Sequence, residues 1–330
     1  MEGHILTVKV VSISSAKEGQ AAMRRRRAMV RLDRQLEKGN CKAALSLMKQ
    51  FKAHPAGFIR GFGAAAVPKV SGRVTSFDLA GRSKKSSLQL VIDAILQSLK
   101  RSLEFQLQEE EVEILPKDIR QITDAESCDS IYEDRQMCLQ HEAGHFLVGY
   151  MLGVLPRRYK VPSIEDLLQD KLACGKVEFI GFEFLREVGI DPMSNRTFSK
   201  GKLNKEDGPK PCDKLYHLLR FHLSNAMISK QTLKTFSCVI LGGMAAEHLL
   251  FGYSELLHSD VEKFARVHRW LGFTVDEVDF AHRQAAEATV LLLSSQMEAL
   301  SRLAEAMALG GSVGFCIETI EHTLSWNNKL

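Results

Sequence analysis

Two histidines four residues apart lie on the apolar stripe of a helix-like segment, and this constrains the fold more than any other feature of the chain. The stripe has offsets of 4, 7, 8, 11 and 15 and consists of Met137, His141, Gly144, His145, Val148 and Leu152. Side chains with this spacing share one helix face, and an apolar face packs inward. Ser130 and Glu133 predict a capping box, and Gly153 predicts the helix end. We therefore expect a helix over 130–153 with both imidazoles facing the core.

The two histidines belong to the motif His141-Glu142-Ala143-Gly144-His145, which is typical of zinc peptidases. Residues four apart on a helix lie one above the other, so both imidazoles can bind one ion. Glu142 then projects beside a water molecule, where it can act as the general base and later protonate the leaving amine. The alternative is a chance match in which two buried histidines are hydrogen-bonded in the core. The placement on the apolar face of a helix favours the zinc endopeptidase.

A third metal ligand is expected farther along the chain, because a catalytic zinc usually has three protein ligands. The downstream candidates are Glu247, His248, His258, Asp260 and His268. Spacing and composition do not choose among them. His258 and Asp260, at a predicted loop-to-helix junction, are the most accessible of the five.

Apolar residues at helical spacing predict that most of the remaining chain is helical. Residues 23–53 form one or two basic helices with a break at Gly39-Asn40, and another helix covers 87–108. Ser229 and Thr274 are suitable caps for the starts of two later helices. The predicted C-terminal helices cover 229–252, 260–271, 274–310 and 312–324.

One segment has the period of a strand rather than that of a helix. Residues 176–185 alternate apolar and other side chains, and the phase changes at Ile180-Gly181. This pattern predicts a strand with a bulge. The predicted fold class is therefore mainly α, with a small β-hairpin or short sheet.

Charge and composition divide the chain into three predicted segments. Residues 1–53 are a basic helical N-terminal region, 54–129 hold a linker, a helix and an acidic stretch, and 130–330 form the metallopeptidase domain. Residues 1–60 contain thirteen Lys and Arg against four Asp and Glu, whereas 104–134 contain eleven acidic side chains against two basic ones. Both biases are typical of solvated surface. The net charge of +4 gives no argument for a nucleic-acid partner.

No stretch of the sequence reaches the roughly 18 apolar residues that a transmembrane helix needs. The best candidate, 236–251, is interrupted by two glycines, Glu247 and His248. Seven cysteines without a CxxC pair favour reduced thiols over a disulfide framework. The Arg- and Ser-rich N-terminus fits a transit peptide and a plain basic segment equally well, because it also contains acidic residues.

Three further sequence stretches extend the motif into a longer pattern. The chain reads HEAGHFLVGYMLG at 141–153, LGGMAAEHLLFG at 241–252, HSDVEKFARVHRWLGF at 258–273 and ALSRLAEAMAL at 299–309. In this order they resemble the peptidase domain of the FtsH family of zinc metalloproteases, over about residues 130–324. The resemblance implies a helical zinc endopeptidase, with Zn²⁺ as its cofactor, that acts on unfolded or loosely folded protein.

The same resemblance implies roles for individual residues. The position of the family's third zinc ligand matches Asp260. Glu247 matches an acidic position of the preceding helix, and Gly242 and Gly243 match a close-packing pair. The sequence departs from the family at Leu257-His258-Ser259, before the ligand position, so His258 is an alternative ligand.

The sequence also lacks a part that FtsH enzymes have. Those enzymes carry an AAA ATPase module and membrane helices, whereas no G-x-x-x-x-G-K-[ST] motif occurs here. With FIRGFGAAAVPKV at 58–70, the arrangement resembles a plant plastid group of ATPase-less relatives. This implies a chloroplast location, in the stroma or peripheral to a membrane. The alternative function is a non-catalytic or weakly catalytic metal-binding partner of membrane FtsH-type complexes.

Protein or peptide substrates are the expected partners of such a site. In the family, a strand beside the zinc accepts the substrate as an added strand. The matching segment is 177–184, and its apolar side chains are Val177, Phe179, Phe182 and Phe184. The alternative is a hairpin that packs in the core.

Overall fold

The computed structural model divides into two compact units, each built from separate stretches of the chain. Unit 1 comprises Met1–Ala66, Ser127–Ile180 and Leu293–Leu330, and unit 2 comprises Val67–Glu126 and Gly181–Leu292. The structure describes residues 20, 22–54, 59–65, 82–111, 128–170, 173–185, 229–255 and 258–327. Most of these residues are helical, which confirms the predicted fold class.

Helix α4, Cys128–Met151, is the central element of unit 1. Its residues from Met137 to Met151 are all buried, because it packs against α11, Met297–Ala308, and against the sheet. Helix α12, Val313–Asn327, packs in turn on α11. A short helix, α5, covers Ile164–Gln169 and also contacts α4.

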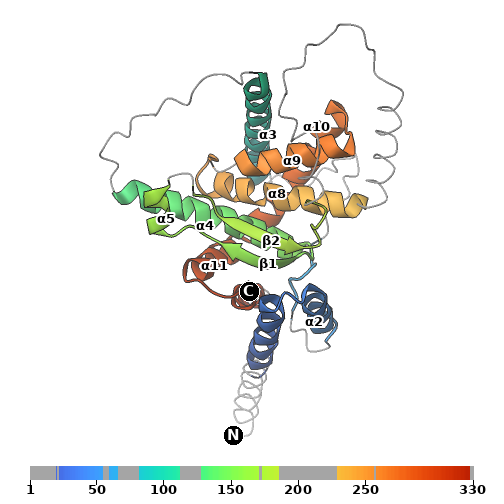
Figure 1. The fold of residues 1–330 in the computed structure, drawn as a ribbon, viewed down its shortest axis with the longest axis vertical. Coiled ribbons are helices and arrows are strands. Elements are labelled where there is room, and N and C mark those ends of the chain that lie inside the picture. The colour runs from blue at the N-terminus through green and yellow to red at the C-terminus, as the bar shows by residue number, and fades with distance from the viewer. Residues whose placement is uncertain are drawn as a thin grey trace, which may run out of the picture. The chain divides into compact units, whose positions relative to one another are not determined.

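The small sheet of unit 1 consists of two antiparallel strands, β1 (Leu155–Lys160) and β2 (Lys176–Ile180) (Figure 1). The sheet packs on α4 through the Phe179 ring, which occupies the space where a side chain on Gly149 would otherwise lie. This two-stranded sheet, with α5 between its strands in sequence, confirms the predicted short sheet.

The predicted strand boundaries were wrong. The strand ends at Ile180 rather than near residue 185, because Gly181 has a positive φ of 108° and turns the chain away. The register irregularity lies between Pro156 and Arg158 on β1, not at Ile180-Gly181.

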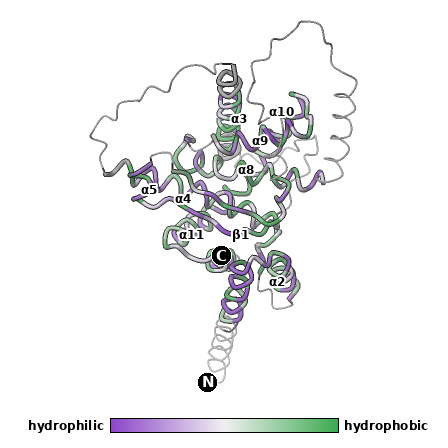
Figure 2. The backbone as a smooth tube through the Cα atoms, in the orientation of Figure 1, coloured by the Kyte–Doolittle hydropathy of each residue, from purple (hydrophilic) through white to green (hydrophobic). Residues whose placement is uncertain are grey.

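The basic N-terminal region forms two helices, 22–37 and α2, Cys41–Ala53, which are separated at Gly39 as predicted. Hydrophilic residues dominate the first of them (Figure 2). Asp33 joins this helix to α12, since its carboxylate accepts hydrogen bonds from Ser312 Oγ at 2.6 Å and Gly314 N at 2.7 Å. The basic helix is therefore attached to the rest of unit 1 through the first turn of α12.

A buried carboxylate joins three parts of unit 1. Glu321 of α12 is fully buried and accepts hydrogen bonds from Arg60 N at 2.8 Å, Gly61 N at 2.6 Å and the Tyr150 hydroxyl at 2.6 Å. Tyr150 lies near the end of α4. This contact fixes residues 59–65 beside the helix that carries the two motif histidines.

Unit 2 is built from α3 (Arg82–Glu111), α8 (Lys230–Leu250), α9 (His258–Leu271) and α10 (Val275–Ser294). Helix α3 packs on α8 and α9, and those two contact each other. The aromatic core of the unit contains Phe182, Phe184, Phe236 and Phe264. Within the described chain, α8 is the one helix long and apolar enough to cross a membrane, and most of it is buried in the structure, as in the core helix of a folded domain.

The helix caps test the local predictions. Ser229 accepts a hydrogen bond from Thr232 N, and Thr274 forms a reciprocal cap with Glu277, as expected. The capping box at Ser130 was wrong, because α4 begins at Cys128 and Ser130 lies inside it. The predicted single helix over 274–310 was also wrong, since α10 ends at Ser294 and α11 begins at Met297.

Candidate metal centre

Helix α4 holds the two motif histidines one turn apart on its buried side. The exposed fractions of His141 and His145 are 4% and 6%. Their Nε2 atoms are 2.9 Å apart, and their ring planes meet at 80°. The two imidazoles therefore direct a nitrogen atom each to the same point, as their helical spacing predicts.

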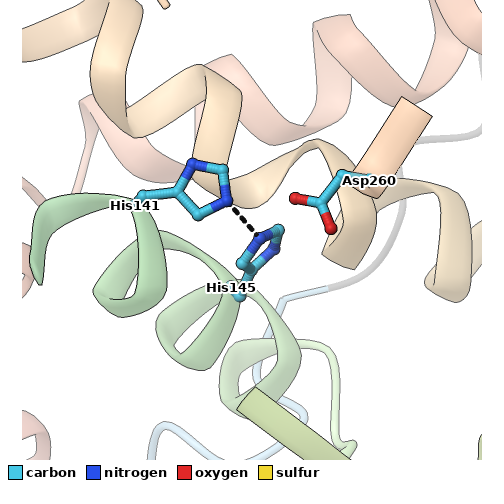
Figure 3. A group of neighbouring side chains, drawn as sticks. All are labelled: His141, His145 and Asp260. Carbon is cyan, nitrogen blue, oxygen red and sulfur yellow. Dashed lines mark hydrogen bonds between the residues drawn. The ribbon is translucent and has the colours of Figure 1, made fainter. Parts of the chain in front are cut away.

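Asp260 completes a group with these histidines (Figure 3). It lies in the first turn of α9, is only 4% exposed, and accepts a hydrogen bond from Lys263 Nζ at 2.9 Å. The ligand atoms of His141, His145 and Asp260 all lie within 4.8 Å of one another. Three buried donors thus form a group that could hold a metal ion.

The donor atoms suit a divalent transition metal. Imidazole nitrogen and carboxylate oxygen are ligands for several first-row ions, zinc among them. Two ligands of a tetrahedral zinc ion lie about 3.3 Å apart when each bond is about 2.0 Å. The Nε2 separation of 2.9 Å is close to this value, so a small rotation of either ring is sufficient for coordination. The residues therefore fit the zinc ion that the sequence predicts.

Glu142 follows the first of these histidines and is buried within α4. The backbone of Gly175 lies directly against its carboxyl group. A Cβ atom on Gly175 would come within 2.5 Å of Glu142 Cγ and 2.7 Å of Glu142 Oε1. Only a glycine leaves the carboxyl group this space. Sequence analysis missed Gly175, because its contact with Glu142 joins residues that are far apart in the chain.

The remaining candidate ligands lie elsewhere, apart from His258, whose side chain is outside the described residues. Glu247 is fully buried in α8, and its Oε2 accepts a hydrogen bond from Glu255 N at 2.8 Å. The His248 ring lies 3.4 Å from Ser98 Oγ of α3, and its pKa is lowered because burial disfavours the charged form. His268 packs beside His282. Among the described residues, Asp260 is the one candidate that joins the two motif histidines.

The other predicted residues are part of the helix and strand framework. Gly242 and Gly243 are buried within α8, in keeping with close packing. Val177 and Phe179 lie in β2, so they remain candidates for a substrate strand. Phe182 and Phe184 lie beyond that strand, and their rings pack against Phe236 in the core of unit 2.

No family model, curated protein or solved structure matches this chain. The likeness to the FtsH peptidase domain therefore rests on the sequence motifs alone.

Proposed function

We propose that the protein is a zinc-dependent endopeptidase of the FtsH type. The observation that carries this proposal is the buried group of His141, His145 and Asp260. A histidine pair on one helix occurs in many proteins. A distant carboxylate that joins the pair, at the position that the family resemblance implies, makes the arrangement more specific. The intact Glu142 supports catalysis over simple metal storage.

His141, His145 and Asp260 would hold the zinc ion, which polarises a carbonyl and lowers the pKa of a water molecule when bound. The Glu142 carboxylate accepts the proton of the attacking water and then donates it to the leaving nitrogen. Gly175 keeps the space beside this carboxylate open. Burial of Glu142 limits competing bulk water at the proton-transfer step.

The substrate is proposed to bind as an extended chain beside β2. Val177 and Phe179 belong to that strand, and main-chain hydrogen bonds to a strand edge accept many sequences. The buried positions of Phe182 and Phe184 remove these two residues from the proposed edge. The expected substrate is thus a loosely folded protein rather than one defined sequence.

Two further parts of the proposal concern the setting of the enzyme. A membrane FtsH-type complex is the proposed source of the unfolding power that a stable substrate would need. A chloroplast location is proposed from the sequence resemblance.

Zinc analysis and casein cleavage test the function directly. The purified chain is assayed with and without a chelator and ATP, beside the Glu142→Gln variant. We expect one zinc per chain in both proteins, cleavage by the wild type only, and loss of cleavage with chelator. Equal cleavage by Glu142→Gln would refute the mechanism. Zinc without cleavage in either protein would favour the alternative, a metal-binding partner of FtsH-type complexes.

A further inference from the structure

A second pair of buried histidines lies within unit 2. His268 belongs to α9 and His282 to α10, and their exposed fractions are 3% and 5%. Their ring centroids are 5.3 Å apart, with the planes tilted by 58°. The centroid distance in the pair of His141 and His145 is 4.6 Å. The separation of the two rings in this pair is thus similar to that in the candidate metal centre.

Three ring nitrogens of this second pair are buried without a hydrogen-bond partner among the residues that the structure describes. They are Nδ1 and Nε2 of His268 and Nε2 of His282. A buried polar atom without a partner is unfavourable, and most such atoms in folded proteins are satisfied by protein, water or an ion. In a neutral imidazole one ring nitrogen carries a hydrogen and the other an electron pair, so at least one of these buried nitrogens has an electron pair that a metal ion could accept.

The surroundings of the two rings are aromatic. The Phe264 centroid lies 4.5 Å from that of His268 and 4.6 Å from that of His282. The Phe273 ring stacks on His268 with the centroids 5.3 Å apart and the planes 27° from parallel. Aromatic faces attract a cation of low charge, but they do not neutralise a divalent ion as carboxylates do.

Burial also keeps the two imidazoles neutral. Desolvation, with a smaller effect from His282, lowers the pKa of His268 to about 3. Desolvation lowers the pKa of His282 to about 4, against a small opposing effect of Asp279. A neutral imidazole has an electron pair available on one nitrogen, so both rings are able to coordinate metal at neutral pH.

We propose that His268 and His282 bind one Cu⁺ ion through a ring nitrogen each. Cu⁺ is a d¹⁰ ion that is stable with two neutral nitrogen donors, whereas Zn²⁺ needs about four ligands. The ion carries a single positive charge, which suits an aromatic site without a coordinating carboxylate. This site differs from the group of His141, His145 and Asp260, which combines two imidazoles with a carboxylate and suits a divalent ion.

Anaerobic titration of the full-length chain with Cu⁺ tests the proposal. Accessible thiols are first blocked with iodoacetamide, and the protein is loaded with zinc. Cu⁺ is then added against a coloured chelator that competes for it. The His268→Phe/His282→Phe double variant keeps an aromatic ring at each position and removes the nitrogens. His322→Phe, which changes an exposed histidine, is the matched control. We expect the double variant to bind one Cu⁺ fewer per chain than the wild type and the control.

X-ray absorption of the thiol-blocked wild type with one Cu⁺ keeps the test valid if the double variant does not fold. A two-coordinate shell of nitrogen atoms supports the site. A shell that contains sulfur, or equal Cu⁺ binding by a folded double variant and the wild type, overturns it.

Discussion

The carboxylate of Glu321 gives the sharpest stability prediction. It accepts two backbone hydrogen bonds, from Arg60 and Gly61, and one from the Tyr150 hydroxyl; the bonds from Gly61 and Tyr150 are buried and the bond from Arg60 is partly buried. Glu321→Ala leaves these three donors without their acceptor. An unsatisfied buried donor costs about 1–3 kcal/mol, so the expected loss of unfolding free energy for three donors is about 3–9 kcal/mol. This is a large part of the roughly 5–15 kcal/mol that stabilises a typical folded protein.

Tyr150→Phe is the matched variant, because it removes one of the three hydrogen bonds and keeps the aromatic ring. An intramolecular hydrogen bond contributes about 0.5–1.5 kcal/mol, so we expect a smaller loss than for Glu321→Ala. Burial first, and then the neighbouring Glu321, raise the pKa of Tyr150 well above its usual value, so its hydroxyl remains a donor at neutral pH.

Urea unfolding followed by circular dichroism measures both losses, and amide hydrogen exchange measures the local effect. In Glu321→Ala the amides of Arg60 and Gly61 should exchange much faster than in the wild type. An unfolding midpoint within error of the wild type, together with unchanged exchange at these two amides, would show that the carboxylate does not hold the segment 59–65.

Three further substitutions test the site and its framework. Gly175→Ala should displace the carboxyl group of Glu142 and reduce casein cleavage by at least tenfold. The zinc content should stay at the wild-type level, and unchanged cleavage would contradict the close contact. Gly149→Ala forces the Phe179 ring off α4 and should lower the unfolding free energy by about 1–3 kcal/mol. Urea titration measures this loss, and an unchanged unfolding free energy would mean that the β1–β2 sheet shifts without strain. Thr274→Ala removes the cap of α10 and should cost about 1 kcal/mol, measured as a lower unfolding midpoint, with cleavage of casein unaffected.

Local sequence signals were reliable for helix ends that are set by interactions between neighbouring residues. The break at Gly39 and the cap at Ser229 both occur as predicted. The same signals failed at Ser130, because the helix continues through the expected cap to Cys128. They also failed at Ser295-Gln296, where neither glycine nor proline marks the end of α10.

The sequence by itself determined the pair His141 and His145, because a spacing of four and a helical stripe are local properties of the chain. Spacing and composition left five candidates for the third ligand, and the family resemblance pointed to Asp260. The tertiary structure places the Asp260 carboxylate with the two histidines, whereas Glu247, which is similar in chemistry and close in sequence, lies elsewhere. The contact between Gly175 and Glu142 also depends on how the chain returns to α4. The physical reason is that helical spacing is set by neighbouring residues, whereas the meeting of distant side chains depends on how whole elements pack.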